Sequence, residues 1–128
     1  MKTLLVARCS HPSQNLSSQI EELKSAYPEG ELRTGYRSGV STKNKAELQK
    51  LLDECEEGDR MVFVRLSRVC RSLHQFLWFY EAAENKGVNI VLLSEALDFS
   101  TPTGRMNAKL LAVICEWQRE VQLENIRE

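Results

Sequence analysis

Basic side chains and a serine gather at two places where short apolar runs of the chain end. Arg8-Cys9-Ser10 closes the first apolar run, and the segment from Arg65 to Arg71 follows a later one. Guanidinium groups match the oxygen geometry of phosphate, and a serine hydroxyl beside them is a nucleophile or a hydrogen-bond donor. These residue types predict a site for a small anion such as a phosphate group.

The spacing of these residues favours their convergence. Arg8 and Ser10 are two residues apart, so both side chains leave a strand on the same side. Arg68 and Arg71 are three residues apart and share a face at a helix start. Between Arg60 and Arg71 there are four arginines and no acidic residue. The alternative is that the arginines are ordinary solvated residues and that Ser10 belongs to a loop or caps a helix.

Other catalytic or ligand patterns are weak. His11 adjoins Ser10 but points elsewhere if the strand continues, which disfavours it as a general base. The four cysteines form no CxxC pair, and the two histidines are not spaced as zinc ligands. The sequence also contains no Walker A or GxGxxG motif. We therefore expect neither a metal nor a cofactor.

The elements that must position these residues alternate along the chain. Apolar runs predict strands over 3–8, 61–66 and 88–93, with a weaker strand over 31–36. Helical spacing predicts helices over about 15–26, 48–55, 73–86 and 103–128, with 37–44 as a loop. This order predicts one α/β domain with a mostly parallel sheet flanked by helices, in which ligands bind beyond the carboxyl ends of strands.

The last predicted helix is long for such a domain. A helix over about 103–128 exceeds the usual 11 to 12 residues, and a core of about 100 residues does not cover it. Its apolar positions alternate steps of three and four residues, as in a coiled-coil seam. These positions are Met106, Leu110, Val113, Trp117 and Val121. We expect this stripe to pack on a second copy of the chain; the alternative is a core helix that packs on the sheet.

Composition limits the class of protein further. The 128 residues are 42% hydrophobic and 27% charged, with a net charge of -1, which fits one domain with a core and excludes a polycationic tail. No run of about 18 apolar residues is present, and the first apolar run is too short for a signal peptide. Because the cysteines fall inside predicted elements, we expect reduced thiols and a cytoplasmic protein.

Several ordered motifs resemble those of the serine recombinases, the resolvase and invertase family. The opening Ala7-Arg8-Cys9-Ser10, followed by Gln14 and Gln19, is similar to the family's signature segment. Other similar segments cover almost the whole chain: Ser38-Gly39, Gly58-Asp59, Leu66-Ser67-Arg68, Arg71-Ser72, Ala96-Leu97-Asp98, Ser100-Thr101-Pro102, Gly104-Arg105 and Glu116-Trp117-Gln118-Arg119-Glu120.

The resemblance implies a catalytic domain that cleaves and rejoins double-stranded DNA. Ser10 would attack a phosphodiester, form a 5′-phosphoserine link and release a 3′-hydroxyl, without metal or cofactor. Arg8, Arg68 and Arg71 would bind the scissile phosphate, and the last helix would build a homodimer and a synaptic tetramer. The resemblance also implies supporting positions: Gln14, Gln19, Ser38, Ser67 and Arg119.

The chain departs from the family pattern at several positions. Val6 stands where an aromatic residue is usual, Tyr36 where an acidic residue is frequent, and Ser67 where resolvases often have Asp. The family's loop arginine has no identical match. Lys45 is the nearest cation and Lys43 the alternative, and lysine keeps the charge but lacks the bidentate fork. These departures bear on activity more than on fold.

The end of the sequence also departs from the family. Family members carry a DNA-binding domain after the long helix, whereas this sequence ends at Ile126-Arg127-Glu128 without a helix stop signal. We expect a catalytic fragment that lacks the DNA-binding domain; the alternative is a natural short relative. Two other functions stay open, a non-catalytic partner that dimerises with a recombinase and a small phosphate-binding α/β protein.

Overall fold

The computed structural model describes residues 1–9 and 15–127, including their side chains except those of Cys115, Arg119 and residues 125–127. Within these residues the strands are β1 (Thr3–Cys9), β2 (Glu31–Tyr36), β3 (Arg60–Phe63), β4 (Asn89–Leu92) and β5 (Leu97–Asp98). The helices are α1 (Ser17–Ala26), α2 (Ser41–Asp53), the 3₁₀ turn η1 (Leu66–Arg68), α3 (Leu73–Lys86) and α4 (Pro102–Arg127).

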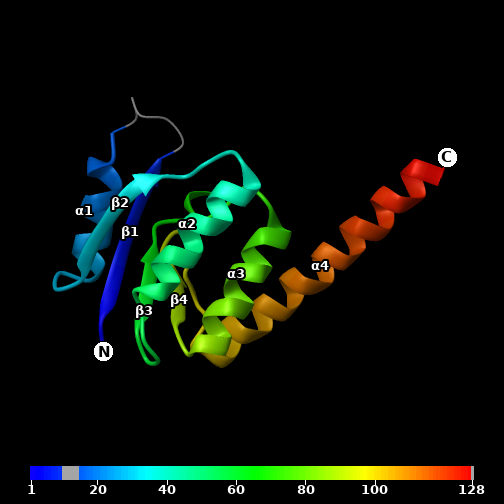
Figure 1. Ribbon diagram of the computed structural model, residues 1–128. Helices are drawn as coiled ribbons and strands as arrows, with labels where there is room; N and C mark the ends of the chain where they lie inside the picture. The colour runs from blue at the N-terminus through cyan, green and yellow to red at the C-terminus, as the bar shows by residue number, and fades with distance from the viewer. Residues whose placement is uncertain (10–14, 128) are drawn as a thin grey trace.

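The strands form one sheet in the order β2-β1-β3-β4-β5. The first four are parallel, and β5 is an antiparallel edge strand beside β4. β1 therefore lies inside the sheet between β2 and β3, and the carboxyl ends of all three meet at one edge (Figure 1). The prediction of an α/β fold with a mostly parallel sheet is confirmed.

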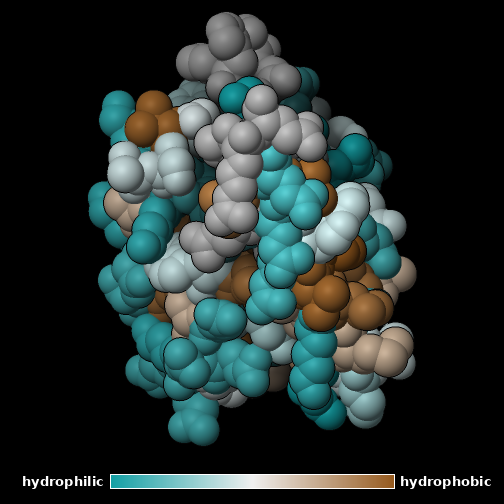
Figure 2. All heavy atoms as spheres, turned by 90° about the vertical axis from the view of Figure 1, so that its right-hand side faces the viewer, coloured by the Kyte–Doolittle hydropathy of each residue, from teal (hydrophilic) through white to brown (hydrophobic). Residues whose placement is uncertain are grey.

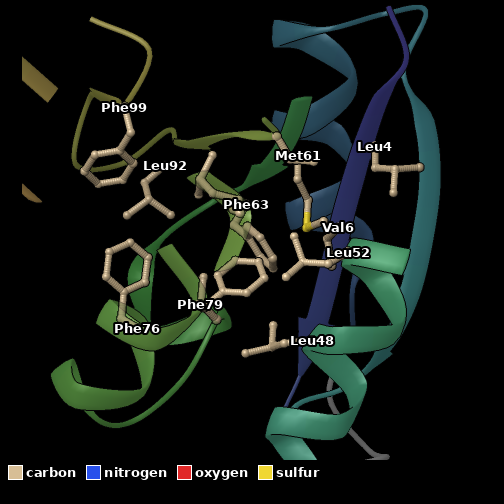
Figure 3. Close-up of a cluster of buried hydrophobic side chains, with 14 of the residues drawn as sticks. Leu4, Val6, Leu48, Leu52, Met61, Phe63, Phe76, Phe79, Leu92 and Phe99 are labelled. Carbon is tan, nitrogen blue, oxygen red and sulfur yellow. The ribbon is translucent and has the colours of Figure 1, made fainter. Parts of the chain in front are cut away.

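Alternating side chains of β1 serve two hydrophobic clusters on opposite faces of the sheet. Leu4 and Val6 join the larger cluster, which is built with α2, α3 and the first turns of α4 (Figure 3). Leu5 and Ala7 join the smaller cluster beneath α1. This alternation follows from the two-residue period of a strand. Helices therefore cover both faces of the sheet, as Figure 1 shows, and β1 is buried between them.

Several element boundaries differ from those predicted. Residues 41–44 belong to α2 and not to a loop; their polar composition suggests a loop, but Asn44 is buried and its amide hydrogen bonds fix the first helical turn. β3 ends at Phe63, because the chain turns into η1. α2 ends at Asp53, and β4 covers only Asn89–Leu92. The two-residue strand β5 lay in a predicted loop, since so short a strand carries no periodic signal.

Only the first turns of α4 pack on the body. Ala108 is buried and Leu111 packs against the larger cluster, and at Gly104 an added Cβ would lie 2.0 Å from the carbonyl oxygen of Asp98. Beyond these turns the helix projects away from the sheet (Figure 1). Its 26 residues correspond to a length of about 39 Å. In the described residues, no helix is long and apolar enough to cross a membrane.

Most of the predicted stripe on α4 is exposed. Met106, Leu110, Val113 and Trp117 have exposed fractions of 55%, 52%, 61% and 61%, whereas Val121 is half-buried. Figure 2 views the face from which α4 projects and shows hydrophobic residues at the surface among hydrophilic ones. The stripe is thus not part of the core that the described residues form.

Candidate active site

The carboxyl end of β1 is completed by a side chain. The pairing of β1 with β3 ends at Val6 and Phe63, so the backbone of Arg8 has no strand on that side. The carboxamide of Gln19, which is buried, takes the place of the missing strand. Its Oε1 accepts from the Arg8 N–H at 3.2 Å, and its Nε2 donates to the Arg8 carbonyl at 2.8 Å. Gln19 therefore fixes the backbone of the residue two positions before Ser10.

The guanidinium of Arg8 is buried and held from three sides. Its Nη1 donates to the carbonyl of Val69 at 3.2 Å, and its Nη2 donates to the Asn44 side chain and to Glu47 Oε2 at 3.0 Å. The Arg8 side chain is only 3% exposed, whereas Glu47 is 42% exposed. Burial lowers the pKa of Arg8, and the neighbouring Glu47 carboxylate opposes that change. Arg8 remains a fixed cation.

Asn44 joins α2, the η1 segment and α3 at this point. Its Nδ2 donates to the carbonyl of Val69 at 3.0 Å and to Gln75 Oε1 at 2.6 Å. Gln75 in turn donates to the carbonyl of Ser41 at 2.9 Å. A buried amide whose donors and acceptor are all used restricts the geometry of its neighbours. The network thus ties Arg8 to the segment that carries the other arginines.

Arg68 and Arg71 come from the segment after β3. Arg68 ends the 3₁₀ turn η1, and Arg71 lies between η1 and α3. Their spacing predicted a shared face at a helix start. In the structure they do not lie on one α-helix, because the chain first forms the tighter 3₁₀ turn. The side chain of Arg68 is half-buried and that of Arg71 is exposed. The positive charges of both lower the pKa of a third guanidinium, that of Arg37.

Arg37 follows β2 directly and was not singled out from the sequence. Its backbone N–H donates to the carbonyl of Cys9 at 2.7 Å, which extends the pairing of β1 and β2 by one residue. Its side chain is 9% exposed. Burial and then the positive charges of Arg71 and Arg68 lower the pKa of Arg37. Its position after a parallel strand was the available signal, because the carboxyl ends of such strands share one edge.

Cys70, which lies near these arginines, is a poor nucleophile. Burial raises the pKa of the Cys70 thiol to about 11, although the nearby positive charges of Arg37 and Arg8 favour the thiolate. Its Sγ lies 3.2 Å from the carbonyl oxygen of Ser72. At neutral pH Cys70 is therefore a protonated, buried thiol.

The other predicted site residues have different placements. Ser10, Gln14 and His11 lie outside the described residues, and so does the side chain of Arg119. Ser67 is exposed on η1. Ser38 supports the start of α2, where its Oγ accepts from the backbone N–H of Val40 at 3.0 Å.

Lys45 does not take the place expected of it. Its Nζ lies 4.8 Å from the centre of the Trp78 ring on α3. It is not among the charged neighbours that shift the pKa values of Arg8 and Arg37. The physical reason is its position on the exposed side of α2, next to the buried Asn44. The structure therefore brings Arg37, and not Lys45, to Arg68 and Arg71.

Comparison with known proteins shows the family to which this chain belongs. The sequence pattern described as "Resolvase, N terminal domain" matches residues 3–128. The chain therefore belongs to the resolvase family of serine recombinases. It is 30% identical over 118 residues to the transposon Tn917 resolvase of Enterococcus faecalis, covering 92% of this chain and 63% of the resolvase. It is 31% identical over 120 residues to the DNA-invertase of Enterobacteria phage P7, covering 94% and 63%.

The match extends to solved structures and concerns part of the relatives' length. The N-terminal catalytic domain of TP901-1 integrase superposes with a TM-score of 0.72 at 18% identity, covering 94% of this chain and 98% of that domain. A resolvase family site-specific recombinase from Streptococcus pneumoniae gives 0.71 at 19% identity, covering 99% and 94%. These structures confirm the fold. Among curated relatives, the chain spans 63%, 39% and 66% of the length of three that it matches.

Proposed function

We propose that this chain is the catalytic domain of a site-specific DNA recombinase with Ser10 as its nucleophile. The observation that carries the proposal is the arginine cluster at the carboxyl edge of the sheet, formed by Arg8, Arg37, Arg68 and Arg71 next to the strand that leads to Ser10. The resolvases and invertases among its relatives support double-stranded DNA as the substrate.

The proposed reaction is a phosphoryl transfer. The Oγ of Ser10 forms a bond to phosphorus, and the bond from phosphorus to the 3′-oxygen breaks. The proton that Ser10 loses is balanced by the proton that the leaving 3′-oxygen gains. The product is a 5′-phosphoserine link and a 3′-hydroxyl, and the reverse reaction rejoins a strand. Charge accumulates on the equatorial oxygens in the transition state, where fixed guanidinium groups stabilise it.

Several of the described residues have a proposed part in this reaction. Arg68 and Arg71 bind the phosphate oxygens, and Arg8 supplies a fixed positive charge beneath them. Gln19 holds the backbone of Arg8 through the pair of hydrogen bonds described above. We assign no catalytic role to Lys45, because its ammonium group lies over Trp78. Ser67 is available at the site but carries no negative charge at any pH of interest.

The exposed stripe of α4 is the proposed contact between copies of the chain. Four of its side chains each expose more than half of their surface: Met106, Leu110, Val113 and Trp117. Methionine and tryptophan are enriched at protein interfaces, and methionine adapts to more than one packing. We propose that α4 builds a homodimer and that two dimers assemble a tetramer when DNA sites pair.

Trapping the covalent intermediate tests the nucleophile. The protein is incubated with duplex DNA from the region around its own gene, quenched in detergent and digested with nuclease and trypsin. Cleavage after Arg8 and Lys24 gives the peptide 9–24, which mass spectrometry examines for an attached nucleotide phosphate. We expect the modification on Ser10 and its loss in Ser10→Ala. Modification that persists in Ser10→Ala, or that maps to Ser13, Ser17 or Ser18, would refute the assignment.

A further inference from the structure

We propose that Arg37 is a phosphate-binding residue of this site and supplies the cation that Lys45 does not. The inference deepens the proposed function, because it assigns a residue to the same phosphate. It places the third strand end of the sheet, that of β2, in the site together with those of β1 and β3. Three features of this one side chain support the assignment: its burial, its lack of partners among the described residues and the charge around it.

Two buried guanidinium nitrogens in this cluster lack hydrogen-bond partners within residues 1–9 and 15–127. Among the described residues, the Nη1 of Arg37 and the Nε of Arg68 are buried and donate to no acceptor. Buried polar groups are almost always paired in folded proteins, so each exception needs an explanation. These two donors belong to neighbouring side chains, since the charge of Arg68 acts on Arg37, and together they could bind an acceptor with several oxygens.

The charge around Arg37 is also uncompensated. The groups that act on its pKa are Arg71, Arg68 and the Cys70 thiol, and no carboxylate is among them in the described part of the chain. Arg8 differs, because Glu47 balances its charge. Removing a cation from water without a counterion costs free energy, and a bound anion offsets this cost. A tetrahedral oxyanion fits this set of donors, because it accepts from several guanidinium groups together.

The backbone keeps Arg37 in place. Its N–H is bonded to Cys9 at the end of β1, and two residues later Gly39 lies against Arg71, whose Nη1 is 3.6 Å from the position of an added Cβ. The start of α2 is then fixed by Ser38. The segment between β2 and α2 is thus held at both ends and packs beside Arg71. The backbone of Arg37 is thus fixed beside the cluster by the extension of the sheet.

Binding of free sulfate tests the proposal without DNA and without Ser10. The wild-type chain, Arg37→Gln and the control Arg105→Gln are titrated with sodium sulfate at constant ionic strength. Arginine side-chain N–H signals in ¹H–¹⁵N spectra report binding. Arg105 is exposed on α4 and bonds only to the carbonyl of Ser100 among the described residues, so its substitution removes the same charge away from the cluster.

We expect Arg37→Gln to weaken sulfate binding about tenfold or more and Arg105→Gln to change it less than about twofold. We also expect Arg37→Gln to unfold in urea at the same concentration as the wild type or a higher one, because an uncompensated buried cation is removed. A purely structural arginine would instead destabilise the fold when replaced. Should Arg37→Gln fail to fold, Arg37→Lys keeps the charge without the fork and is expected to bind sulfate more weakly than the wild type.

Three results would overturn the assignment: no sulfate binding by the wild-type chain, equal affinities of Arg37→Gln and Arg105→Gln, or wild-type affinity in Arg37→Lys. The outcome is separate from that of the covalent trapping experiment. Sulfate binding that depends on Arg37 without a DNA adduct on Ser10 would leave this inference intact and refute the proposed function. An adduct on Ser10 with Arg37-independent sulfate binding would do the reverse.

Discussion

Replacing Gln19 with alanine is the sharpest test of how this site is held. The substitution removes both hydrogen bonds to the Arg8 backbone, at 3.2 and 2.8 Å, in a buried position. β3 has already ended, so no strand can replace them. Each buried backbone group left without a partner costs about 1–3 kcal/mol, so the two groups together lead us to expect that Gln19→Ala lowers the free energy of unfolding by about 2–6 kcal/mol.

The assay is thermal and urea unfolding followed by circular dichroism. For a domain of this size 1 kcal/mol corresponds to about 4 °C, so the melting temperature should fall by about 8–24 °C. The control is Gln49→Ala, which removes an exposed side-chain bond to Asp53 and should change stability by less than about 0.5 kcal/mol. If the two variants melt at the same temperature, Gln19 does not act as the missing strand and the argument is wrong.

Three further predictions concern other parts of the chain. Trp117→Glu should leave the melting temperature unchanged, because this side chain is 61% exposed, and should weaken self-association in sedimentation experiments; loss of folding would show instead that Trp117 is core. Gly104→Ala should destabilise the fold by about 2–3 kcal/mol or more, because the added Cβ would clash with the backbone of Asp98. The control is Gly35→Ala, whose added Cβ has no atom within 4 Å and should change stability by less than about 1 kcal/mol in the same thermal melt. Asp59 accepts two backbone N–H bonds that lower its pKa, so the stability that it adds is present at neutral pH and is lost as the pH falls through that lowered pKa. Asp59→Asn should therefore be less stable than the wild type at pH 7. Urea titrations should show this difference in stability closing toward pH 3.

Much of the fold follows from periodicity in the sequence. The apolar run of β1 predicts a strand buried on both faces, and the structure sends Leu4 and Leu5 to opposite clusters. The end of α3 is also predictable from the sequence, because Gly87 readily adopts the left-handed conformation that ends the helix there. The start of α2 was harder to predict from the sequence. Its first turn is polar, and what makes it helical is the burial of Asn44 against residues far away in the chain.

The candidate site was predictable in its chemistry and less so in its membership. Arg8, Arg68 and Arg71 could be named, because arginines after apolar strands stand out. Arg37 was missed because β2 is a weak, partly exposed strand, so the residue after it looks like ordinary loop. Lys45 was named for its charge alone, and its contact with Trp78 depends on how α2 packs on α3, which no local pattern reveals.

The ion pair between Arg8 and Glu47 has a consequence for how an anion would enter. Arg8 has already lost its water, and its favourable contact is with a carboxylate that is itself 42% exposed. An arriving phosphate would therefore not have to dehydrate this guanidinium; it would exchange one anion for another while Glu47 swings into solvent. Such an exchange is sensitive to the geometry of the incoming group, because a ligand that fits poorly loses the competition to a carboxylate tethered only 3.0 Å away. An anion at Arg8 would therefore have to displace the carboxylate that already pairs with this guanidinium.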